Sequence, residues 1–166
     1  MTEQSVYNLF NLPKKRDGSE GICVTTNGMI RKDGRAVMGA GVAKAFRDRY
    51  EGLDYTLAKS LRENGNVVSD LGIKEGYHII SFPTKNNWKD NSDINLIEQS
   101  AKQLVQLADK LNLTTVWLPQ PGCTNGHLDW ETVKKVIEPY LDDRFIVTSR
   151  PQPTYSYDKN DTEIER

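Results

Sequence analysis

The sequence has few of the residues that hold metal ions or disulfide bonds. Its 166 residues include only two cysteines, Cys23 and Cys123, and only two histidines, His78 and His127. A structural zinc site needs about four Cys or His ligands at short spacings, and a disulfide scaffold needs more cysteines than these. We therefore expect no metal, no cofactor and a reducing compartment, taken to be the cytoplasm.

Long apolar runs and an excess of one charge are also missing. No run approaches the roughly 20 apolar residues of a membrane span, and the N-terminal MTEQSVYN lacks the basic and apolar regions of a secretory signal. Lys and Arg total 22 against 23 Asp and Glu, a formal net charge of −1. The net charge of the whole chain therefore does not favour nucleic-acid binding, although a local basic patch could still bind nucleic acid. We expect no membrane partner.

What remains is the composition of one folded domain. The length lies within the roughly 50 to 200 residues of a single domain. Hydrophobic residues make up 37% of the chain and charged residues 27%, which is too apolar for a disordered chain. From residue 151 the sequence is polar and aperiodic. We expect a domain over residues 1–150 and a polar C-terminal tail over 151–166.

Short apolar runs alternate with helical patterns along this domain. The runs predict strands at 5–10, 22–26, 77–82, 114–118 and 145–148. Apolar residues that recur every three or four positions predict helices at 41–50, 53–64, 93–112 and 130–141. Strands that alternate with helices favour an α/β domain with a largely parallel sheet covered on both faces.

Ligands of open α/β sheets bind beyond the carboxyl ends of the strands, and the first such loop is glycine-rich. Residues 27–38 follow the 22–26 strand and enter a helix through Gly39-Ala40-Gly41-Val42. Free N–H groups and the helix dipole favour an anion there, typically a phosphate. The alternative is a turn that only packs the helix on the sheet.

Two further loops carry polar groups. Lys85 follows the 77–82 strand, where it faces a phosphate, a ribose hydroxyl or a leaving group, unless it is simply solvated. In the loop 119–127 (PQPGCTNGH), Gly122 and Gly126 bracket N–H groups suited to a diphosphate. His127 is a candidate general base or ribose contact, or an ordinary loop histidine. Cys123 has no basic neighbour in sequence and is expected only to pack.

Neither glycine-rich loop is a P-loop, since no G-K-[ST] follows. Together with a lysine between them, they predict a pocket for a nucleotide diphosphate, and the residues alone name no reaction.

These residues resemble the macro domain family, which binds ADP-ribose. Asn27 followed by VMGAGVAKAF resembles the family's first ligand loop, LPQPGCTNGHLDW resembles the second, and the likeness covers about residues 21–149. FPTKNNW, which contains Lys85, is similar to the branch of the DarG antitoxin, which removes ADP-ribose from thymine bases of DNA. The related human terminal ADP-ribose protein glycohydrolase has a lysine there too. The resemblance implies a three-layer α/β/α fold with a mixed, largely parallel sheet.

The resemblance also implies roles for the site residues. Backbone donors of the two glycine-rich loops would hold the diphosphate, Asn27 would contact the distal ribose, and Lys85 would stabilise charge on the leaving group. His127 is the second candidate for acid–base work. The expected ligand-binding set is Thr26, Asn27, Met38, Gly39, Ala40, Gly41, Val42, Pro119, Gly122, Cys123, Thr124, Asn125 and Gly126.

The sequence departs from the family at four places, one of which is a longer segment between Asn27 and Gly39. The family's N-x-x-N is VTTN here, the catalytic aspartate of the human enzyme is replaced by Gly126, and no adenine-binding acid is evident near 8–17, where Asp17 is the remaining candidate.

We expect a monomer that hydrolyses ADP-ribose from a DNA base or a protein side chain. The alternatives are a non-catalytic reader of ADP-ribose or a related nucleotide, and an ADP-ribose 1″-phosphate phosphatase. A DNA substrate would meet a basic rim, whose alternative is an ordinary solvated surface; the rim comprises Arg31, Lys32, Arg35, Lys85 and Lys89.

Overall fold

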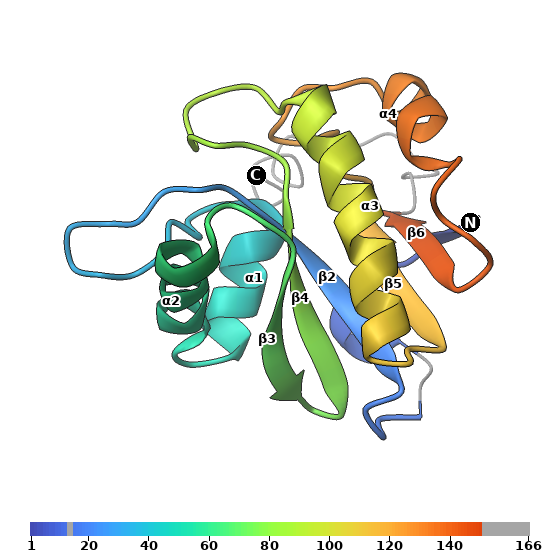
Figure 1. Cartoon of the computed structure of the whole chain (residues 1–166), viewed down its shortest axis with the longest axis horizontal. Helices are drawn as coiled ribbons and strands as arrows, with labels where there is room; N and C mark the ends of the chain where they lie inside the picture. The colour runs from blue at the N-terminus through green and yellow to red at the C-terminus, as the bar shows by residue number, and fades with distance from the viewer. Residues whose placement is uncertain (13–14, 151–166) are drawn as a thin grey trace, which may run out of the picture.

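The computed structural model describes residues 1–12 and 15–150, and the expected tail at 151–166 lies outside the described residues. A six-stranded sheet with the order β1-β6-β5-β2-β4-β3 forms the middle layer (Figure 1). Its strands are β1 (Thr2–Ser5), β2 (Glu20–Thr26), β3 (Ser69–Lys74), β4 (Tyr77–Pro83), β5 (Thr115–Pro119) and β6 (Phe145–Ser149). All neighbouring strands pair in parallel except β3, which runs antiparallel to β4.

Four helices cover the two faces of the sheet: α1 (Gly41–Arg49), α2 (Leu53–Asn64), α3 (Ile94–Lys110) and α4 (Trp130–Ile137). Successive side chains of β2 point to opposite faces. Ile22 and Val24 therefore join the core beneath α1 and α2, whereas Cys23 joins the core beneath α3 and α4. The predicted three-layer arrangement with a mixed, mostly parallel sheet is confirmed.

The predicted strand at 5–10 is wrong. The first strand is β1, which ends at Ser5 and pairs only with β6. The side chain of Asn8 then accepts a hydrogen bond from Phe10 N and begins a short 3-10 helix, Leu9–Asn11. That turn places Leu9 and Phe10 against the core of α1 and α2, so their apolar character reflects packing rather than a strand.

Strand β3 was missed by the sequence analysis because its pattern is weak. Its sequence, SDLGIK, contains one buried residue, Leu71, and its pairing with β4 shifts register between Asp70 and Ile73. An edge strand with a bulge buries too little apolar surface to show a two-residue period.

The helix boundaries follow local signals. Helix α2 spans the predicted residues and stops at Gly65, whose φ is 83°. Asp93 and Asp129 cap α3 and α4 by accepting backbone N–H groups. Helix α4 ends at Ile137, four residues before the predicted end, because Pro139 has no N–H to continue it.

The parallel strands direct three loops to one edge of the sheet, namely the edge formed by the carboxyl ends of β2, β4 and β5. Strand β2 pairs in parallel with both β4 and β5, so the loops that follow these three strands leave from the same edge, at the upper end of the sheet in Figure 1. Among the described residues, no helix is both long and apolar enough to cross a membrane.

Candidate functional site

The loop after β2 is a finger closed at its base by Asn27. The Asn27 side chain donates from Nδ2 to Val37 O (3.1 Å) and accepts at Oδ1 from Met29 N (3.0 Å). An antiparallel bridge joins Ile30 to Ala36 further out, and the finger projects from the sheet in Figure 1. The Asn27 amide therefore shapes the loop that is expected to meet a ligand.

The positive charge of the finger is partly neutralised. Asp33 lies 3.1 Å from Arg31 and 2.7 Å from Arg35 in ion pairs. Hydrogen bonding from Arg35 lowers the pKa of the Asp33 carboxyl, so Asp33 is ionised at neutral pH. The Arg35 guanidinium also lies over the Tyr55 ring at 5.8 Å. The finger contributes three cations to the expected basic rim: Arg31, Lys32 and Arg35. Together with the anion Asp33 they give the finger a net charge of about +2.

Helix α1 begins at the other end of this loop with an uncapped N-terminus. Ala40 makes no side-chain capping bond, and the first turn carries no acidic residue. In the described part of the chain, the N–H groups of Gly41, Val42 and Ala43 donate to no acceptor. Unpaired N–H groups and the helix dipole make such an end attractive to an anion. Gly39 and Ala40 are exposed beside it, whereas Met38 is buried in the core.

The loop after β5 offers a second set of N–H groups. It leaves Pro119, the last residue of β5, and turns at Gly122, whose φ is 77° and whose carbonyl accepts from Leu128 N (2.9 Å). Between residues 123 and 126, no backbone N–H donates to an acceptor within the residues that the structure describes. Thr124 and Asn125 are exposed there.

The two N–H-rich loops meet at Gly41 and Asn125. Gly41 has a φ of 58°, and a Cβ built on it would lie 2.8 Å from Asn125 Nδ2. Glycine adopts this left-handed conformation without strain. The two loops predicted to hold a diphosphate are thus adjacent in space.

Lys85 joins the third loop to this pair. Its Nζ donates to Asn125 O at 3.2 Å, and its backbone follows directly on Thr84, whose N–H donates to the carbonyl of Thr26 at the end of β2 (3.0 Å). No carboxylate pairs with Lys85 among the described residues. The ammonium is held by a neutral carbonyl, so no anionic side chain competes with an incoming ligand.

His127 is less constrained than Lys85. It is exposed, adopts a φ of 61°, and its backbone N–H approaches Thr124 O at 3.4 Å. Its ring makes no hydrogen bond with the residues that the structure describes. The structure thus ties Lys85, but not the His127 ring, to the other predicted site residues.

Gly126 is enclosed rather than open to the site. A Cβ at this position would lie 2.7 Å from Ser92 Cβ and 2.5 Å from Gly122 O, and still closer to Ser92 Oγ. Ser92 N donates to Gly126 O (3.1 Å), which holds the two segments together. An aspartate at this place would have no room.

Asp17 lies at the other end of the strands, where their amino ends are. It precedes the amino end of β2, and its Oδ1 accepts from Ser19 N (3.0 Å) and Ser19 Oγ (2.5 Å). Because seven residues of strand separate the two ends of β2, Asp17 lies roughly 20 Å from the loops at the carboxyl end of that strand.

The Cys123 thiol is a poor nucleophile. Burial, with a smaller contribution from Asp129, raises its pKa to about 11, and its Sγ lies 3.4 Å from Pro121 O. The thiolate is the reactive form, so Cys123 acts in the loop through its packing and its backbone. In the described residues, no three His, Cys, Asp or Glu side chains are grouped to hold a metal ion.

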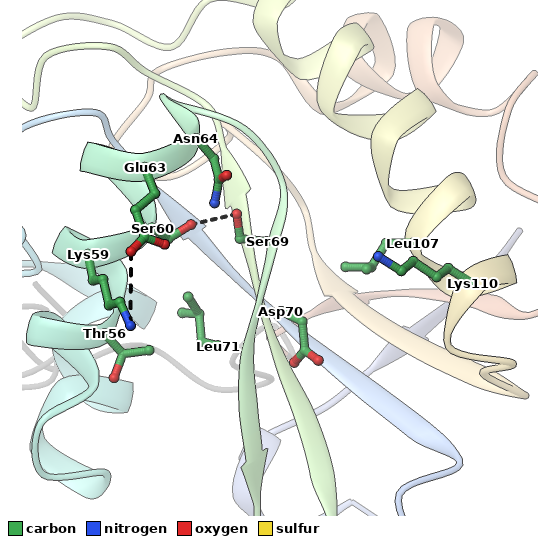
Figure 2. Close-up of a pocket in the computed structure, with 10 residues that line it drawn as sticks. All are labelled: Thr56, Lys59, Ser60, Glu63, Asn64, Ser69, Asp70, Leu71, Leu107 and Lys110. Carbon is green, nitrogen blue, oxygen red and sulfur yellow. Dashed lines mark hydrogen bonds and ion pairs between the residues drawn. The ribbon is translucent and has the colours of Figure 1, made fainter.

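A separate hollow of about 330 Å³ lies between α2, β3 and the end of α3 (Figure 2). None of the predicted site residues lines it. Several of its polar groups already pair: Ser60 Oγ donates to Ser69 Oγ at 2.7 Å, and Lys59 lies 4.0 Å from Glu63. Asn64 and Lys110 are also in its wall.

One residue with a direct link to Lys85 was missed by the sequence analysis. Asn66, in the connection from α2 to β3, donates from Nδ2 to Lys85 O (2.9 Å). The stretch Asn64-Gly65-Asn66 signals a turn, but only the long-range contact reveals what the Asn66 side chain does.

The model of a known family, described as "Macro domain", matches residues 32–137. The chain belongs to the macro domain family. The matched span holds the outer part of the finger, the start of α1, Lys85 and the loop after β5.

Three similar proteins place this macro domain among its relatives. It is 36% identical over 106 residues to a DNA ADP-ribosyl glycohydrolase of Mycobacterium tuberculosis, which covers 60% of this chain and 30% of the relative. A Thermus aquaticus protein of the same name is 33% identical over 112 residues, with 64% and 31% covered. The macrodomain of M. tuberculosis DarG superposes with a TM-score of 0.71 and 26% identity over 92% of this chain and 99% of that one.

The chain spans about a third of the length of the curated relatives that it matches. The likeness to the DarG macrodomain extends over nearly all of both structures.

The enclosure of Gly126 predicts a stability defect. Gly126→Ala should lower the free energy of unfolding by about 1–3 kcal/mol, because the added methyl group overpacks against Ser92. Gly39→Ala is the matched control, since nothing lies within 4 Å of its Cβ position, and should stay within about 0.5 kcal/mol of wild type. Urea denaturation measures both; equal losses would contradict the packing argument.

The raised pKa of Cys123 predicts slow alkylation. At pH 7.5 iodoacetamide should modify it on the order of 100-fold more slowly than an unperturbed cysteine of pKa near 8.5. The rate should climb about tenfold per pH unit toward pH 10, because the thiolate fraction does so below the pKa. Peptide mass spectrometry separates it from the fully buried Cys23, and a rate like that of free cysteine would refute the assignment.

Proposed function

We propose that this macro domain binds ADP-ribose at the carboxyl edge of its sheet and hydrolyses the bond that joins ADP-ribose to a macromolecule. The observation that carries the proposal is the contact of Lys85 Nζ with Asn125 O at 3.2 Å. It places a cation without a carboxylate partner beside two neighbouring runs of free N–H groups. The names of the relatives, DNA ADP-ribosyl glycohydrolases, support the same reaction.

The diphosphate is held by backbone donors. The N–H groups of residues 41–43 and of residues 123–125 donate to no acceptor within the described residues, and Gly41 approaches Asn125 between the two sets. Such N–H clusters bind phosphate oxygens. Asn27 contacts the distal ribose as part of the base of the finger. Thr26 and Pro119, the last residues of β2 and β5, and Met38 line the walls of the proposed pocket with their backbone atoms.

Lys85 acts on the scissile bond. Water adds hydroxide to C1″ of the ribose while the bond from C1″ to the base or side chain breaks and the leaving group takes up the proton. Charge develops on the leaving group in this step, and a positioned ammonium stabilises it more strongly than solvent does. His127 is the second candidate for proton transfer.

A reader that binds ADP-ribose without turnover is the alternative, and the absence of an acid at Gly126 favours it. Phosphatase action on ADP-ribose 1″-phosphate is a further alternative that needs the same pocket. Turnover of an ADP-ribosylated macromolecule identifies the hydrolase, and release of phosphate from ADP-ribose 1″-phosphate separates the phosphatase from the reader.

For the macromolecule, we propose DNA. The finger carries Arg31, Lys32 and Arg35, and the loop of Lys85 carries Lys89 beside Trp88, a residue that is 51% exposed. Cations that track phosphates and an exposed aromatic that stacks on bases are the usual means of binding single-stranded nucleic acid.

Lys85→Ala should abolish release of ADP-ribose and leave its binding nearly intact. Calorimetry with ADP-ribose, beside AMP as the weaker ligand, measures binding, and we expect a micromolar Kd for wild type, about −8 kcal/mol. Release from an ADP-ribosylated oligonucleotide measures turnover, which should fall by at least about 100-fold. Lys110→Ala, far from the loops, is the matched control. Binding by wild type with no turnover of any substrate would establish the reader instead.

Binding of ADP-ribosylated DNA should weaken as salt is raised, since phosphate contacts release counterions. Lys32→Ala should reduce the slope of log Kd against log salt concentration by about 1, whereas Lys110→Ala should not change it. A Kd independent of salt would exclude the basic finger as a DNA contact.

A further inference from the structure

Asn66 holds the backbone of Lys85 from a distant part of the chain. Its Nδ2 donates to Lys85 O and to Asn86 Oδ1, both at 2.9 Å. Asn66 lies in the connection from α2 to β3, nineteen residues before Lys85. Its side chain thus crosses from one connection to the loop that carries the proposed catalytic lysine.

The orientation of the Asn66 amide is determined by its partner. A backbone carbonyl such as Lys85 O only accepts hydrogen bonds, so the NH₂ group of Asn66 must face it. Asn66 Oδ1 is then left buried with no partner among the described residues. A buried acceptor without a partner is unfavourable, and the two donations to the Lys85 loop compensate for it.

The same amide also meets the first loop. Gly28 N donates to Asn86 O (3.2 Å), and a Cβ on Gly28 would lie 3.0 Å from Asn66 Nδ2 and 3.1 Å from Asn86 O. Asn66 therefore lies at the junction where the base of the finger meets the Lys85 loop. Displacement of Asn66 would loosen both segments together.

We propose that Asn66 is the positioning residue for Lys85, an inference that rests on the proposed function. Lys85 is fixed at its carbonyl by Asn66 and at its ammonium by Asn125 O. A lysine side chain has four rotatable bonds, so its Nζ occupies one place only when both ends are held. Asn66 touches no ligand in this scheme, and its effect on the reaction passes entirely through Lys85.

The competing interpretation is that Asn66 only closes the turn between α2 and β3. Under that interpretation its loss lowers stability and leaves the Lys85 segment and its chemistry unchanged. Asn64 provides the matched control, because it is the same residue type two positions earlier, is exposed, and lines the separate hollow of Figure 2.

The first readout needs no activity. In Asn66→Ala, hydrogen exchange of the segment 84–90 should rise by at least about tenfold, because the anchor of Lys85 O and Asn86 is gone. Asn66→Asp keeps the shape but presents oxygens to those two acceptors, so it should show the same rise. Asn64→Ala should exchange like wild type. Unchanged exchange in both Asn66 variants would overturn the proposal.

The second readout is kinetic. Asn66→Ala should lower kcat for ADP-ribose release by about 10- to 100-fold, while the Kd for free ADP-ribose stays within about twofold. In a Lys85→Ala background, Asn66→Ala should cause no further loss of residual activity, since residues that act as a unit are non-additive. An equal further loss in that background, or a loss of affinity instead of kcat, would overturn the positioning role.

The two readouts distinguish failure of the proposed hydrolysis from failure of the inference about Asn66. If wild type binds ADP-ribose but releases none from any substrate, the proposed hydrolysis fails and the catalytic part of this inference falls with it. Hydrogen exchange then still decides whether Asn66 holds the segment. If wild type is active and Asn66→Ala matches it in both exchange and kcat, only the inference about Asn66 is overturned.

Discussion

The parallel pairing of β2 with β4 on one side and β5 on the other is the constraint on which the site depends. It brings the ends of three strands to one edge, so loops that start at residues 27, 84 and 120 become neighbours. Each loop alone is an ordinary connection. Only when they converge does the Lys85 ammonium reach a carbonyl of the loop after β5, and only then does Gly41 lie against Asn125. The covering helices α1 to α4 serve this edge by burying both faces of the sheet, which keeps the strand ends in register.

Much of this architecture was accessible from the sequence because its signals are local. The buried runs of β2, β4, β5 and β6 are β-branched and short, and α2 and α3 carry a clear apolar stripe. The errors occur where local pattern and tertiary packing disagree. Leu9 and Phe10 are apolar because they cover the core and not because they form a strand, and β3 is an irregular edge strand whose burial depends on β4.

The sequence proposes candidate residues for the site but does not show how they lie relative to one another. Glycines at the start of α1 and in the loop after β5 can be read as N–H-rich turns from the sequence, whereas their contact through Asn125 cannot. The role of Asn27 in closing the finger, and that of Asn66 at the carbonyl of Lys85, depend on side-chain hydrogen bonds across ten and nineteen residues. No periodicity carries such information. Asp33 is a residue whose effect the sequence analysis overlooked, because its ion pairs neutralise part of the predicted basic rim.

The enclosure of Gly126 has an evolutionary consequence. A chain of this kind cannot acquire a functional side chain at that place by one substitution, because the new side chain would collide with both Ser92 and the carbonyl of Gly122. Ser92 would have to shrink and the turn at Gly122 would have to widen in the same lineage. Positions 92, 122 and 126 are therefore coupled. A macro domain with this packing keeps glycine at position 126 until Ser92 and the turn at Gly122 change as well.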